Sequence, residues 1–159
     1  LAVTIPRKGA EVARMTEKDM EDVLEIREAL DELAAKIACT RMTEDQLKQL
    51  ETIKETFVES TRSHDVKRIA EADVSFHDVI YEATGNPKLV SMLNNLREQI
   101  YRYRVEYLKE EKNYPTLIGE HEAIVEALYA RNQDEVVRAM HTHIENQASA
   151  VKEIIREQE

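Results

Sequence analysis

Three histidines and one aspartate occupy positions where a helical repeat directs side chains into a protein core. Asp73 and His77 are four residues apart, so they share one face of a helix. His121 and His143 belong to two later segments, each at a position where the apolar pattern calls for a core residue. Three imidazoles and one carboxylate in a common core suit a divalent Zn, Ni, Mn or Fe ion, with zinc preferred.

The same four residues have other interpretations. A histidine on an apolar face is commonly a packed side chain that hydrogen-bonds to a neighbour. Each buried imidazole and the carboxylate needs a partner, however, and one metal ion would satisfy all four at once. A helical metalloenzyme is an alternative, although position 125 is Val, so the two-histidine zincin motif is absent and no catalytic base can be named. A purely structural metal in a dimerisation module is a further alternative.

Two arginines also lie on or near inward faces. Arg27 follows Val23 by four residues and precedes Leu30 by three, which places it among apolar residues. It could form an ion pair with Asp31, or direct its guanidinium at a carboxylate ligand inside the fold. Arg104 lies near the inward stripe of a later segment. Arg27 and Arg104 are therefore the candidate residues for binding an anionic effector.

The elements that would position these side chains are helices. Capping residues predict helix starts at Thr16, Thr43 and Asp65. Gly85-Asn86-Pro87 ends one helix and begins a long one, which Asn113-Tyr114-Pro115 breaks. Two further helices are expected at about 116–130 and 134–157. The sequence thus predicts an all-α, antiparallel bundle of six to seven helices with a metal site in its core.

Composition narrows the class of function. The chain has 159 residues, enough for one domain with a sizeable core, and a formal net charge of −10. This acidic balance argues against nucleic-acid binding by these residues alone. The single cysteine, Cys39, favours a reducing, cytoplasmic setting. No apolar run reaches the roughly 20 residues that span a bilayer, so no membrane role is expected.

Taken together, these motifs resemble the FCD effector domain of the FadR subfamily of GntR-type bacterial transcription regulators. The resemblance runs from about Met20 to the last helix. It rests on the following segments: Val23-Leu24-Glu25-Ile26-Arg27-Glu28-Ala29-Leu30-Asp31, Ala72-Asp73-Val74-Ser75-Phe76-His77, Gly85-Asn86-Pro87, Glu120-His121 and His141-Thr142-His143. Position 31 is Asp where many relatives carry Glu, which is a small departure.

The resemblance implies specific roles. Asp73, His77, His121 and His143 would bind the divalent metal, and a small carboxylate effector would meet that metal and Arg27. Residues 1–15 are similar to the wing and linker of a winged helix, with residues 16–159 forming the effector-binding domain. The resemblance further implies a homodimer that contacts DNA only through an N-terminal domain missing from this chain. It does not identify the effector, the target genes, or whether binding represses or activates.

Overall fold

A computed structural model describes residues 16–158 of the chain, and within these residues the fold is entirely helical. The elements in chain order are α1 (Glu17–Arg41), α2 (Glu44–Ser60), α3 (Val66–Ala83), α4 (Pro87–Asn95), α5 (Arg97–Leu108), the short 3₁₀ helix η1 (Glu111–Asn113), α6 (Tyr114–Tyr129) and α7 (Gln133–Gln158). The predicted all-α bundle is therefore confirmed. The predicted wing and linker at residues 1–15 lie outside the described residues.

Local capping sets the starts of four helices as the sequence predicts. The Thr16 hydroxyl accepts the backbone N–H of Asp19 at the start of α1. Thr43 begins α2 with a complete capping box, and the Asp65 carboxylate caps α3. Asn86 caps α4, whose first residue is a proline. These side chains satisfy backbone N–H groups that have no partner inside their own helix.

The prediction of a single long helix after Pro87 is wrong, because the chain bends at Leu96. Helix α4 ends at Asn95, and α5 starts at Arg97 with no side-chain cap. Neither Gly nor Pro stands at the bend. The apolar spacing through Leu93, Leu96 and Ile100 continues across it, so the sequence pattern did not reveal the break.

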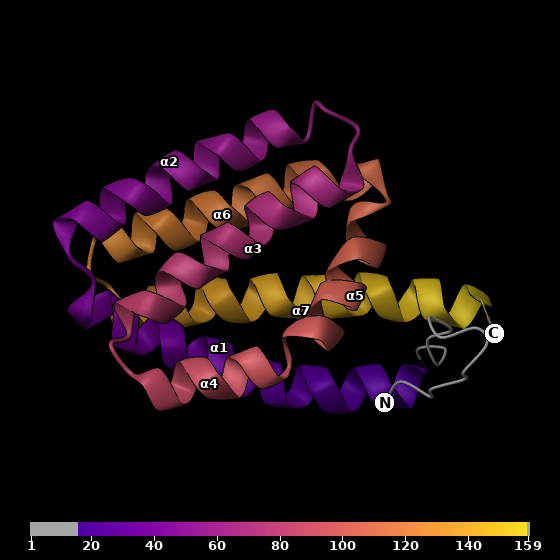
Figure 1. Cartoon of the computed structure of the whole chain (residues 1–159), viewed down its shortest axis with the longest axis horizontal. Helices are drawn as coiled ribbons and strands as arrows, with labels where there is room; N and C mark the ends of the chain where they lie inside the picture. Colours follow the sequence, from indigo (N-terminus) through magenta and orange to yellow (C-terminus); the bar gives the residue numbers. More distant parts are fainter. Residues whose placement is uncertain (1–15, 159) are drawn as a thin grey trace, which may run out of the picture.

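The helices form an antiparallel bundle in which α7 runs through the middle (Figure 1). Helix α1 lies along α7 in the opposite direction, and this is the most extensive helix pair. Helix α6 packs against the other side of α7, while α2 and α3 pack on each other and α2 also contacts α6. Helix α5 lies against α3 and α7, whereas the short α4 has few contacts with its neighbours.

Most of the core consists of two large apolar clusters separated by a layer of buried polar residues, and a third, smaller cluster contains Ala34, Tyr81, Leu89 and Leu93. On α7, for example, Ile144 belongs to one cluster and Val151 to the other. On α3, likewise, Ile69 and Ile80 belong to different clusters. The polar layer contains the following buried residues: Arg27, Asp31, Asp73, His77, Arg104, Glu120, His121, His143 and Gln147. Every predicted site residue therefore lies between the two clusters.

Among the described residues, no helix is both long enough and apolar enough to span a lipid bilayer.

Candidate metal centre

Helices α3, α6 and α7 bring the four predicted ligands together. Asp73 and His77 lie one turn apart on α3, His121 comes from α6, and His143 from α7. One ligand atom from each residue lies within 4.8 Å of the others, and all four residues are buried. The fold thus brings the four side chains that the helical repeat directs inward to one point.

The contacts within this group are those of ligands directed at a common centre. The Nε2 atoms of His77 and His143 are 3.1 Å apart, and Nε2 of His121 is 2.9 Å from Oδ1 of Asp73. Nε2 of His77 lies 3.8 Å from the same Asp73 oxygen. Three imidazole nitrogens and one carboxylate oxygen form a donor set of the kind that zinc binds in tetrahedral sites.

Neighbouring groups fix the orientation of two of these rings. Nδ1 of His143 lies 2.8 Å from the Glu120 carboxylate, which favours a proton on Nδ1 and leaves the Nε2 lone pair for a metal. The His121 ring stacks on Phe76 with ring centroids 4.0 Å apart, and Phe57 packs edge-on against it. A carboxylate–histidine contact behind a ligand is a common feature of metal sites, and here Glu120 supplies it.

The hydrogen bonding of this group fits a bound cation. Nδ1 of His77 and Nδ1 of His121 are buried and have no hydrogen-bond partner among residues 16–158. The Nε2 atoms of His77 and His143 face each other. Because the contact with Glu120 favours a proton on Nδ1 of His143, Nε2 of His143 carries a lone pair at this point. A cation bound to the Nε2 atoms of the three histidines and to Oδ1 of Asp73 would occupy the point on which these four atoms converge, whereas the Nδ1 atoms of His77 and His121 lie outside this point. The residues present therefore suit a divalent metal.

Arg104 is part of the same centre. Its Nε donates to Oδ2 of Asp73 at 2.5 Å, so the opposite oxygen of that carboxylate remains directed at the histidines. Burial alone would raise the pKa of Asp73, but the Arg104 charge and the contact with His121 outweigh it and hold the pKa well below its ordinary value. Asp73 is consequently an anion, which is the form that binds a metal.

Burial lowers the pKa of two of the imidazoles, whereas it acts to raise the pKa of a carboxyl group. It lowers the pKa of His77 well below its ordinary value, although the nearby Asp73 charge acts against this. Burial also lowers the pKa of His121, again opposed by Asp73. Both rings are therefore neutral at neutral pH, and a neutral imidazole is the form that coordinates a metal.

Arg27 lies beside this centre in a second buried network. Its Nε donates to Asp31 at 3.0 Å and its Nη1 to the side-chain oxygen of Gln147 at 2.6 Å. The Tyr81 hydroxyl donates to the other oxygen of Asp31 at 2.6 Å. The predicted ion pair between Arg27 and Asp31 is confirmed. Nη2 of Arg27 and Nε2 of Gln147 have no hydrogen-bond partner in the described part of the chain, so two donors are left for an additional acceptor.

Sequence reasoning assigned no role to three of the residues that complete this site, namely Tyr81, Glu120 and Gln147. Tyr81 follows His77 by four residues, and Gln147 follows His143 by four, so both share the inward faces of the ligands. This four-residue spacing is the feature of the sequence that could have identified Tyr81 and Gln147. The partners of these side chains come from distant helices, and the sequence pattern contains no information about them.

The space beside the metal centre is small. A cavity of about 20 Å³ borders His77, Tyr81 and Arg104. Such a volume accommodates about one water molecule, whereas sites for organic ligands usually measure roughly 300–1,000 Å³. This conformation is therefore closed around the four ligands.

A second group of possible ligands lies at the surface between α1 and α7. It consists of Glu28, His141 and Glu145. Nδ1 of His141 is 2.6 Å from Glu28 and 3.0 Å from Glu32, so ion pairing already accounts for this arrangement. The side chain of His141 is half exposed and lies outside the core.

Comparison with known proteins agrees with this geometry. Residues 22–146 match the FCD domain family. The chain is 22% identical to the HTH-type transcriptional regulator YdhC of Bacillus subtilis over 155 residues, which cover 95% of this chain and 68% of YdhC. It is 24% identical to the galactonate operon transcriptional repressor of Escherichia coli over 133 residues, covering 82% of this chain and 56% of the repressor.

A solved structure with the same fold is that of McbR/YncC from Escherichia coli. The TM-score is 0.83 with 16% sequence identity, and the match covers 89% of this chain and 72% of McbR/YncC. The chain thus spans about three fifths of the length of the curated relatives named here. These relatives are named as regulators of transcription, in agreement with the prediction that the chain is not an enzyme. The chain belongs to the FCD family, the effector-binding domains of GntR-type transcription regulators.

Proposed function

We propose that this domain binds one divalent metal through Asp73, His77, His121 and His143, and that a small organic acid binds beside the metal. The observation that supports this most strongly is the convergence of four buried donor atoms within 4.8 Å. When bound, the metal would supply a fixed positive charge and coordination positions for a carboxylate. Zinc is the preferred ion because the donors are three nitrogens and one oxygen.

The protein itself offers further groups for an acid. The two unpartnered donors, Nη2 of Arg27 and Nε2 of Gln147, match the acceptor oxygens of a carboxylate or a hydroxyl group. Arg104 borders the small cavity and holds Asp73, so it would contribute positive charge to the same region. A relative is named for galactonate, a hydroxylated acid, and this chemistry suits the arrangement of donors here.

The acid would act by changing the packing of the bundle. The ligands come from three helices, and Arg27 adds a fourth, so a molecule in contact with all of them would couple their positions. In the intact regulator, such a change would alter DNA binding by an N-terminal winged-helix domain. That activity would place the regulator in the cytoplasm.

We also propose that two copies pair through an apolar face of α1 and α4. Ile26, Leu33 and Met92 are large apolar residues with 45–52% of their surface exposed, and they lie on these two helices. Antiparallel pairing of two α1 helices would place Glu25 of one copy near Lys36 of the other. The face is therefore complementary to itself in charge as well as apolar, as a two-fold interface requires.

Elemental analysis tests the metal. Protein purified without chelators or a histidine tag should contain nearly one metal per chain, and His143→Ala should lose it. His141→Ala is the matched control because this exposed histidine lies on the same helix, two residues away. Absence of metal from the parent protein would contradict the proposal, and the three histidines would then be ordinary core residues.

Thermal unfolding of the metal-loaded chain tests the acid. D-galactonate should raise Tm, whereas galactose, which lacks the carboxylate, should not. The cavity of about 20 Å³ favours one other function, a metal that only stabilises the fold. A loss of Tm on chelation without any response to acids would identify that function.

A further inference from the structure

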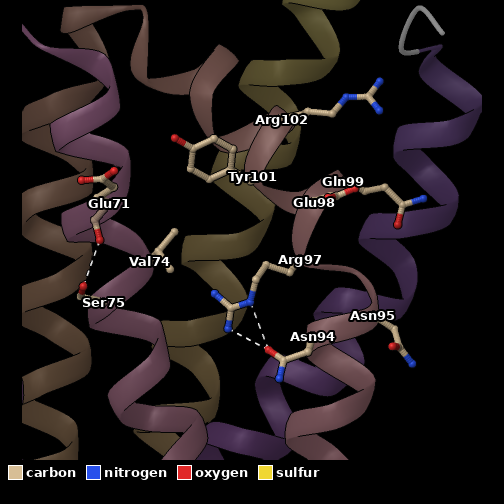
Figure 2. A pocket seen from close by; sticks show the side chains of 10 residues that line it. All are labelled: Glu71, Val74, Ser75, Asn94, Asn95, Arg97, Glu98, Gln99, Tyr101 and Arg102. Atoms are coloured by element: carbon tan, nitrogen blue, oxygen red, sulfur yellow. Dashed lines mark hydrogen bonds between the residues drawn. The ribbon is translucent and has the colours of Figure 1, made fainter. Parts of the chain in front are cut away.

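A wide groove lies on the outer side of the small cavity, between α3 and the bend that joins α4 to α5 (Figure 2). Its volume is about 1190 Å³. Val74 from α3 and Arg97 from the start of α5 point into this groove, and Asn94 of α4 lies beside Arg97.

The groove and the small cavity share a wall. Val74 and Arg97 line both of them, while His77 and Arg104 line only the inner one. These two side chains therefore separate the groove from the metal centre. A solute that passes from the groove to His77 has to displace at least one of them, and only Arg97 is a long, flexible side chain.

Arg97 is held in place by bonds that are easily exchanged. Its guanidinium donates to both oxygens of Asp78 on α3, at 2.8 and 3.4 Å, and to the side-chain oxygen of Asn94. About 40% of each side chain of the Arg97–Asp78 pair is exposed to solvent. Exposed ion pairs contribute little to stability, so the bonds that hold this wall in place are weak.

The backbone near Arg97 also allows movement. Arg97 is the first residue of α5, whose N-terminus has no side-chain cap, and it directly follows the bend at Leu96. Helix α4, on the other side of the bend, has nine residues and few contacts with its neighbours. A change in the position of Arg97 therefore does not require a rearrangement of the packed core.

We propose that Arg97 is the entry gate for the effector and the first group to bind its carboxylate. This inference rests on the proposed function, since it describes the route to the same centre. An incoming carboxylate replaces Asp78 as the bidentate partner of Arg97, so one ion pair is exchanged for an equivalent one. The ion pair between Arg97 of α5 and Asp78 of α3 opens as a result, and the inner cavity becomes accessible.

The charges around the groove indicate the class of ligand that uses this route. Arg97 and Arg102 line it together with Glu71 and Glu98, so positive and negative side chains are balanced. Apart from Val74, the rest of the lining consists of amide and hydroxyl side chains. This lining favours a monocarboxylate with hydroxyl groups over a polyanion, because a polyanion would be repelled by the two glutamates.

The test measures access to His77 in metal-free protein. Diethyl pyrocarbonate modifies neutral imidazoles, and peptide mass spectrometry gives the rate for each histidine. Asp78→Asn and Arg97→Met should each raise the rate at His77 by about fivefold, which corresponds to the loss of an exposed ion pair of about 1 kcal/mol. Glu17→Gln is the matched control, because it neutralises another exposed pair between helices, with Arg156.

Acetate serves as the probe for carboxylate binding. At matched ionic strength, acetate but not chloride should accelerate modification of His77 in the parent protein, and Arg97→Met should abolish this difference. An unchanged His77 rate in Asp78→Asn would overturn the proposal. A common increase at His77, His121 and His143 would also overturn it, since this would indicate general loosening of the bundle. The assay contains no metal, so failure of metal binding would not affect its interpretation.

Discussion

Arg104 holds one oxygen of Asp73 at 2.5 Å and leaves the other oxygen 2.9 Å from His121. A single carboxylate therefore joins a buried arginine to His121, and the same oxygen lies 3.8 Å from Nε2 of His77. This contact unites α5 with α3 and α6 at the level of the polar layer, and it keeps Asp73 ionised despite complete burial.

Arg104→Met should destabilise the metal-free chain by about 3–5 kcal/mol, because it leaves the Asp73 charge buried without its partner. The double variant with Asp73→Asn should recover part of this loss, since no unpaired charge remains. Urea denaturation of the parent protein, both single variants and the double variant would measure the coupling energy. Strictly additive losses would show that the two side chains do not stabilise each other.

The exposed ion pairs of His141 should make stability depend on pH. A hydrogen bond with Glu32 is the main cause of its raised pKa, and the Glu28 and Glu145 charges add to it. A raised pKa in the folded state means that the stabilisation is complete below pH 6.5 and is lost as the pH rises through the folded-state pKa.

His141→Gln should therefore destabilise the chain at pH 5.5 and have little effect at pH 9. The loss at pH 5.5 should stay below about 1 kcal/mol, because the side chain is half exposed and solvent screens the pairs. Denaturation of the parent protein and the variant at both pH values would test this. A larger loss at pH 9 would contradict the assignment.

Substitution of alanine for two of the glycines should change the stability of the chain in opposite directions. Gly85 follows α3 with a φ of +59°, where a Cβ atom is strained, so Gly85→Ala should cost about 1 kcal/mol. Gly119 lies within α6 with open space around its Cα, so Gly119→Ala should stabilise the chain by about 0.5–1 kcal/mol. Thermal or urea denaturation would measure both changes, and effects of equal sign would contradict this interpretation.

Leu33→Glu should weaken the proposed pairing through α1 and α4, because it introduces a charge into an apolar face of both copies. Sedimentation velocity should then show a shift from dimer to monomer. Tyr129→Ser is the control, since Tyr129 is exposed to a similar extent but lies on α6. A dimer that persists in Leu33→Glu would assign the interface to another surface.

Much of this fold follows from local signals in the sequence. Thr16, Thr43 and Asp65 each cap the helix that their side chains predict, and Gly85 occupies the left-handed conformation expected at a helix end. These features depend on residues three or four positions apart. The sequence alone is sufficient to identify them.

The burial of the candidate metal ligands was also predictable, for the same reason. The inward phase of His77, His121 and His143 follows from the apolar residues beside them, and the family resemblance connects them. The break at Leu96 was not predictable, because that residue continues the apolar spacing. The contact between Arg27 and Gln147 was equally hidden, since it joins positions 120 residues apart.

The antiparallel pairing of α1 and α7 has a mechanical consequence. Arg156, near the end of α7, forms an ion pair with Glu17, in the first turn of α1. His143 lies thirteen residues earlier on the same helix, a distance of about 20 Å along its axis. The candidate ligand His143 thus lies near the middle of α7, and the far end of this helix is joined to α1. A tilt of α7 by a few degrees about His143 would move the start of α1 by about 1–2 Å.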